Sequence, residues 1–84
     1  MIIRTNEPVK VLAVYDPATG RTVPHKLNWS GKTHILSRLA YYHRERIGRS
    51  IRHIYHVTDG ELDFRLFVDS DTLSWTLSEV SDGN

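Results

Sequence analysis

The chain has 84 residues, and its 39% hydrophobic and 25% charged content is that of a small globular protein, so we expect a single β domain over 1–84. It contains no cysteine, which excludes disulfide bonds, thiolate nucleophiles and cysteine-bound zinc and fits a reducing compartment. No apolar run approaches the ~20 residues of a membrane span, and 1–7 does not resemble a signal peptide. We therefore expect a cytoplasmic protein with no membrane partner.

Charge is distributed unevenly along the chain. Residues 1–53 hold ten of the eleven Lys and Arg residues and three of the ten acids, a net charge of +7. Residues 54–84 hold one Arg against seven acids, a net charge of −6. The most basic stretch, 38–52, indicates an anionic partner such as nucleic acid. The alternative is that the acidic half neutralises this stretch within the fold.

Turn signals recur at intervals of ~8–15 residues, with β-branched and aromatic residues between them, which predicts an antiparallel all-β meander. The first predicted strand, 9–15, returns through 21–23. Leu27 and Trp29 then alternate toward a tight turn, and the hairpin around that turn pairs Leu27 with His34. The turn signals are Asp16-Pro17, Ser30-Gly31, Gly48-Arg49, Asp59-Gly60 and Ser70-Asp71.

The stretch 33–47 allows two interpretations. Its apolar residues fall at helical spacing and Gly48 is a suitable stop, so a helix at about 33–47, giving an α+β fold, is the alternative. We favour a long strand with a bend or bulge near 37–40, because the segments on either side are hairpins.

The Asp59-Gly60 hairpin is the best specified unit, because this dipeptide favours a two-residue type I′ turn. That turn pairs Val57 with Leu62 and puts the apolar residues of both strands on one face. A further turn at 70–71 adds a third strand, so the predicted strands are 51–58, 61–69 and 72–80. With the upstream strands they make six or so, enough to close into a small SH3-like or OB-like barrel.

Four motifs resemble those of small bacterial domains of unknown function. Residues 27–32, LNWSGK, look like a W-x-G-(K/R) hairpin. Residues 55–60, YHVTDG, and 64–66, FRL, look like the aromatic strand, the turn and the Arg-bearing strand of these domains, and 73–77, LSWTL, look like their terminal W-x-L strand. The resemblance spans about 24–80. Some of these domains resemble products encoded beside an error-prone DNA polymerase of the damage response, so the resemblance implies a role near DNA and supplies no catalytic residue.

The basic stretch holds our candidate nucleic-acid site. We expect its arginines to contact phosphates and release counterions, and a tyrosine to offer a stacking surface for a base. On a strand Tyr41 and Tyr42 face opposite ways, so only one lies beside a given row of arginines. The expected partner is DNA or RNA, and the alternative is a module that binds another protein or forms a homo-oligomer through opposed basic and acidic surfaces. The candidate residues are Arg38, Tyr41, Tyr42, Arg44, Arg46, Arg49 and Arg52.

No other motif predicts chemistry. Residues 30–33, SGKT, lack the upstream Gly of a phosphate loop, and 69–71, DSD, lack the Gly and Glu of a calcium loop. No Ser lies in a G-x-S-x-G turn, and the five histidines give two neighbouring zinc ligands at most. We therefore expect neither an enzyme nor a metal or other cofactor. Phe67, on the face away from Phe64, predicts either a second core layer or a contact surface.

Overall fold

The structure is a computed structural model that describes residues 1–82, and this part of the chain consists of eight strands with no helix. The prediction of an all-β fold is therefore confirmed. Accordingly, these residues form no helix of the length and apolarity that crossing a membrane requires. The strands are β1 (Ile2–Pro8), β2 (Lys10–Asp16), β3 (Arg21–Trp29), β4 (Lys32–Ile35), β5 (Arg38–Ile47), β6 (Ser50–Thr58), β7 (Asp63–Asp69) and β8 (Trp75–Ser81).

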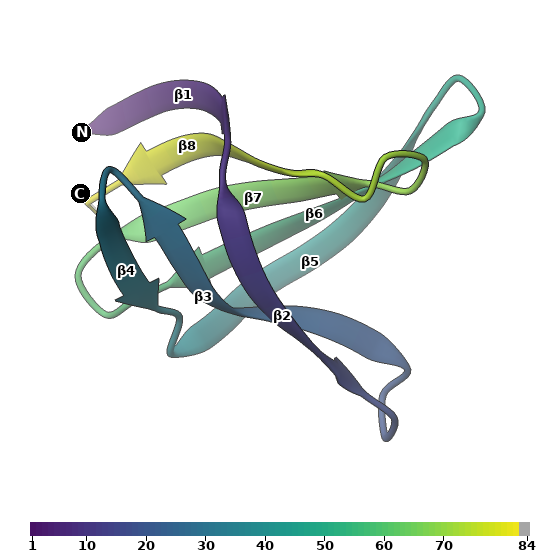
Figure 1. Ribbon diagram of the computed structural model, residues 1–84, viewed down its shortest axis with the longest axis horizontal. Helices are drawn as coiled ribbons and strands as arrows, with labels where there is room; N and C mark the ends of the chain where they lie inside the picture. The colour runs from purple at the N-terminus through teal and green to yellow at the C-terminus, as the bar shows by residue number, and fades with distance from the viewer. Residues whose placement is uncertain (83–84) are drawn as a thin grey trace.

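The strands form two antiparallel sheets, one in the order β1-β8-β7-β6-β5 and one in the order β2-β3-β4 (Figure 1). The chain passes between them at two bends, through Val9 and through 36–37. The predicted closure into a barrel is wrong, because the far ends of the β2–β3 and β5–β6 hairpins diverge and no strand pairing joins them (Figure 1). We call the face of the five-stranded sheet that is turned toward the smaller sheet the inner face, and the opposite one the outer face.

The alternative helix over 33–47 is not formed, and the favoured bent strand is confirmed as β4, a bend and β5. As a strand, β5 provides the antiparallel partner that the backbone hydrogen-bonding groups of β6 require. The pairing begins at the hydrogen bond that the Ser37 N–H donates to the Thr58 carbonyl, at 2.9 Å. A β-bulge between Leu39 and Tyr41 interrupts the register of β5. The bulge lets both Leu39 and Tyr42 pack against the core, which a regular strand does not allow for residues three apart.

The Asp59-Gly60 hairpin has a longer loop than predicted. Val57 pairs with Phe64 rather than with Leu62, so the register is shifted by two residues. Gly60 has a positive φ of 102° but Asp59 does not, whereas a type I′ turn needs both. Instead, Asp59 Oδ1 accepts hydrogen bonds from the backbone N–H groups two and three residues further on, at 2.8 and 2.7 Å. Because the shift is two residues, each side chain keeps its predicted face.

The core lies between the inner face and the smaller sheet. Leu27, in the middle of β3, is fully buried, and its pairing with His34 confirms the predicted β3–β4 register. The inner face supplies every second residue of β6 and β7, as the two-residue period of a strand requires. The buried residues that the five-stranded sheet contributes are Tyr55, Val57, Phe64, Leu66, Leu77 and Val80.

A buried contact joins β4 to the β6–β7 loop. His34 Nδ1 lies 2.9 Å from Asp59 Oδ2, and the His34 ring, 6% exposed, packs against the rings of Trp29 and Phe64. Burial alone raises the pKa of the Asp59 carboxyl. Hydrogen bonds from the Leu62 N–H and from His34 outweigh burial and hold this pKa below its ordinary value of 3.8. The carboxylate therefore stabilises the fold in its charged form.

We expect Asp59→Asn to lower the free energy of unfolding at neutral pH by about 1–2 kcal/mol, because the amide loses the charge-assisted hydrogen bonds. The pKa of Asp59 is lower in the folded state, so its contribution is present above about pH 4 and is lost as the pH falls through the folded-state pKa. Urea unfolding of the two proteins should therefore differ at neutral pH and converge as the pH falls below the folded-state pKa of Asp59. Asp63→Asn, at an exposed position of β7, is the control. An equal difference at both pH values would contradict the role of the charge.

Candidate nucleic-acid interface

Strand pairing divides the predicted site residues between the two faces of the β5–β6 hairpin. Tyr42, Arg44 and Arg46 alternate along β5 on the inner face. Tyr42 lies opposite Tyr55 and Arg44 lies opposite His53, two residues of β6 that also face inward. Both arginine side chains are exposed, whereas Tyr42 is half-buried. The inner face of β5 therefore presents one aromatic ring followed by two guanidinium groups in line.

The other four predicted residues lie elsewhere. Arg49 lies in the two-residue turn at the tip of the hairpin. Arg38 and Tyr41 line a hollow on the outer face. Arg52 also points outward, and its guanidinium carbon lies 4.2 Å from the centroid of the Phe67 ring, a cation–π contact. The seven candidate residues therefore do not form one patch, and the two tyrosines point to opposite faces.

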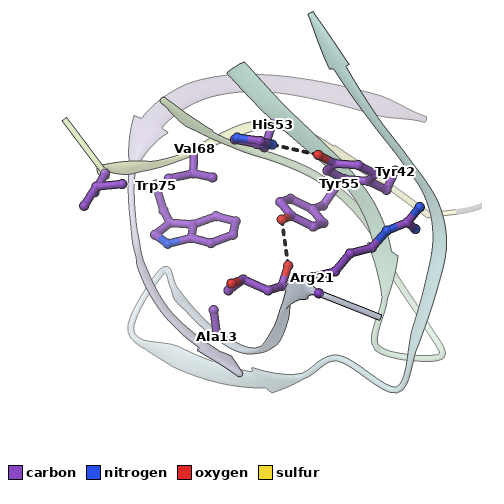
Figure 2. A pocket seen from close by; sticks show the side chains of 10 residues that line it. Ala13, Arg21, Tyr42, His53, Tyr55, Val68 and Trp75 are labelled. Carbon is purple, nitrogen blue, oxygen red and sulfur yellow. Dashed lines mark hydrogen bonds between the residues drawn. The ribbon is translucent and has the colours of Figure 1, made fainter. Parts of the chain in front are cut away.

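An open cleft of about 350 Å³ lies between the inner face and the end of the β2–β3 hairpin (Figure 2). Small-molecule sites in proteins measure ~300–1,000 Å³, so this cleft is at the small end of that range. Its inner-face wall is aromatic and apolar, and its hairpin wall is made of smaller side chains and one arginine. The main lining residues are Tyr42, His53, Tyr55, Val68 and Trp75 of the inner face, Ala13, Arg21 and Thr22 of the hairpin, and Leu73 of the β7–β8 loop.

The aromatic rings of the cleft are held in place by their own contacts. The Tyr55 hydroxyl donates to the Thr22 carbonyl at 2.6 Å, which ties the inner face to the hairpin (Figure 2). Burial, and after it the neighbouring Tyr42, raises the pKa of Tyr55, so the phenol stays a neutral donor. The Tyr42 hydroxyl lies 2.7 Å from His53 Nδ1. The ring centroids of Tyr42 and Tyr55 are 5.0 Å apart, and those of Tyr55 and Trp75 are 5.4 Å apart.

Of the residues that line the cleft, only Tyr42 belongs to the predicted site, and Arg21 and Leu73 are two that the prediction missed. The guanidinium carbon of Arg21 lies 5.2 Å from the centroid of the Tyr42 ring. Leu73 is 73% exposed and has a positive φ of 57°, a conformation that is unfavourable for a residue with a Cβ. The turn signals predict the β2–β3 loop beside Arg21 and the β7–β8 loop that holds Leu73. No local pattern in the sequence indicates that both loops border β5 and β6. Only the tertiary arrangement brings them to one cleft.

The hairpin arginines have no carboxylate partner within residues 1–82. The ion pairs of this part of the chain involve Met1, Arg4 and His34. The acidic 69–71 loop does approach the hairpin, but there the Ser50 hydroxyl donates to the Asp71 carboxylate. The acidic half therefore does not neutralise the basic stretch by direct ion pairing, and the charges of Arg44, Arg46 and Arg49 face solvent.

The outer face has its own group of rings. His43 and His56 stack at 5.8 Å and 27°. Burial, followed by the positive charge of Arg65, lowers the pKa of His56, so its ring is neutral at neutral pH. Ile54 lies between His43 and Phe67 across the strands and is 1% exposed. No described strand covers this face, so neighbouring side chains, and not a second core layer, bury Ile54.

Among residues 1–82, no three His, Asp or Glu side chains lie close enough together to hold a metal ion. No protein-family model, curated protein or solved structure matches this chain. The resemblance to W-x-G-(K/R) domains therefore stays a prediction.

Proposed function

We propose that the protein binds single-stranded nucleic acid on the inner face of the β5–β6 hairpin. The observation that carries this proposal is the alternation of Tyr42, Arg44 and Arg46, which sets two exposed guanidinium groups in line with an aromatic cleft. Side chains two residues apart on a strand are ~6.6–6.8 Å apart, so the arginines form a regular row. Arg49 extends this row to the tip of the hairpin.

The chemistry of these groups suits a flexible polyanion that carries planar rings. Guanidinium groups bind phosphates and release condensed counterions, and aromatic side chains stack on bases of any sequence. DNA and RNA both provide these contacts. The proposal requires no catalytic group, and a cytoplasmic location remains our expectation.

Fluorescence anisotropy with a labelled ~8-nucleotide single strand tests the proposal, over about 50–300 mM salt. We expect saturable binding whose logarithm falls linearly with the logarithm of the salt concentration. The slope should be about −2, from three phosphate contacts at about −0.7 each. The same strand paired with its complement in a duplex should bind more weakly. Binding that is absent at low salt would sink the proposal.

A second candidate function is the binding of a protein strand at the free edge of β5. This ten-residue strand lies at the edge of its sheet and is long for an open edge. We rank it second because Arg44, Glu45 and Arg46 are exposed on this strand, and charged side chains are typical of edges protected against pairing. Sedimentation of the protein alone distinguishes the two candidate functions. Self-association through the free edge of β5 gives a mass that rises with protein concentration.

A further inference from the structure

Phosphate binding by a row of arginines does not require an aromatic cleft, so the cleft needs an explanation of its own. It provides ring faces in an open space of about 350 Å³, next to the arginine row. We infer that the cleft is a subsite for one unpaired nucleobase, whose flanking phosphates lie against Arg21 and Arg44. This inference rests on the proposed function and adds to it the part of the strand that is recognised.

The walls of the cleft match a flat, rigid ring. The hydroxyls of Tyr42 and Tyr55 are engaged by His53 and Thr22, so what faces the space is mainly ring surface. Ala13 lies across the cleft from Trp75, and its single methyl group leaves the space open (Figure 2). A planar ligand between these walls stacks on aromatic rings, which is the mode by which single-strand binders hold bases.

Positively charged guanidinium groups near the cleft favour a planar ligand that also carries a negative charge. The Arg21 guanidinium lies over the Tyr42 ring on the hairpin side. Arg44, the next inward-facing residue of β5 after Tyr42, is exposed and lies opposite His53, which lines the cleft. A base enters with a phosphate on either side of its sugar, so two cations beside an aromatic slot are complementary to a nucleotide. A lipid chain or an uncharged aromatic side chain makes no use of them.

Leu73 is an independent indication of a ligand at this place. It is an exposed apolar side chain in a left-handed conformation, and it lines the cleft. The Leu73 N–H donates to the Asp69 carbonyl at 2.8 Å, so the backbone holds this conformation whatever the side chain. Glycine suits such a position better in the free protein. A leucine there gains contacts when a base occupies the cleft.

The subsite predicts a preference for single strands. A base inside a duplex is stacked on both sides and paired at its edge, and turning it out costs a few kcal/mol. A duplex therefore reaches only the arginine row, whereas a single strand reaches both the row and the cleft.

The test compares two ~8-nucleotide probes, oligo-dT and an abasic strand with the same number of phosphates. We expect the wild type to bind oligo-dT about tenfold more tightly than the abasic strand. Ala13→Phe, which fills the cleft, should remove this preference and leave the contribution of Arg44, Arg46 and Arg49 to the salt slope in place. The matched control is Leu12→Phe, the preceding residue of β2, which is exposed and does not line the cleft.

The outcomes separate the subsite from the proposed function. If the wild type binds neither probe, the proposed function fails and the subsite with it. If it binds both probes equally, or if Ala13→Phe keeps the preference for oligo-dT, only the subsite is wrong. Should Ala13→Phe not fold, Leu73→Gly decides. It should raise the melting temperature, because it relieves backbone strain, and it should weaken oligo-dT binding severalfold without affecting the abasic strand. Unchanged oligo-dT binding by Leu73→Gly would overturn the subsite.

Discussion

Replacing Arg44, Arg46 and Arg49 together with glutamine is expected to lower the affinity for a short single strand on the order of 50-fold at about 0.15 M salt. The reason is the loss of up to three phosphate contacts, each of which contributes about −0.7 to the salt slope on single strands. The slope itself should fall by about 2. Because all three side chains are exposed and have no carboxylate partner among residues 1–82, the fold should be unaffected.

The matched control for this variant removes the same charge from the smaller sheet. Lys10, Lys26 and Lys32 are exposed there, and their replacement with glutamine changes the net charge by the same amount. We expect the control variant to keep most of the wild-type affinity, as measured by anisotropy across the salt series. Equal losses in the two variants would show that binding depends on net charge and not on the hairpin.

Phe64→Ala is expected to have the largest effect on stability. Phe64 is 1% exposed and contacts the rings of Trp29 and His34, so it joins the two sheets. Truncation of a buried Phe costs about 3–5 kcal/mol, of a total of roughly 4–13 kcal/mol for a chain of this length. The melting temperature should fall by roughly 20 °C, or the variant should be unfolded at room temperature, as followed by circular dichroism.

Phe67→Ala is the control for this second prediction. Phe67 follows Leu66 in β7 and lies opposite Ile54 of β6, but it is on the outer face and is half-buried. Its truncation removes the contact with Arg52 and should cost about 1–2 kcal/mol, clearly less than Phe64→Ala. Equal losses would mean that the main core does not lie between the two sheets.

Local patterns predict the hairpins and the faces of their strands well. The Ser30-Gly31 turn and the apolar positions around it give the pairing of Leu27 with His34. The Asp59-Gly60 turn gives the right inward residues in spite of a wrong register, because a shift of two preserves the alternation. Turn residues and strand period act over a few residues, so the sequence around them is sufficient.

Features that depend on distant parts of the chain are not predictable in this way. Strand β1 gives no clear signal, because Ile2 and Ile3 are exposed and the strand has a bulge, and its partner is β8 at the other end of the chain. The failure of the barrel to close follows from how two hairpins diverge in space. Arg21 and Leu73 enter the candidate site for the same reason, since their loops border it only in the folded protein.

Mapping of the binding surface by NMR tests the central claim most directly. Side-chain shifts of labelled protein would be followed during titration with oligo-dT in moderate salt, because side chains and not backbone amides separate the two faces of a strand. We expect saturable shifts at inner-face and cleft residues such as Tyr42, Arg44 and Leu73, and none at Tyr41 or His56 on the outer face. Shifts centred on the outer face, or no shifts at saturating concentrations, would contradict the central claim.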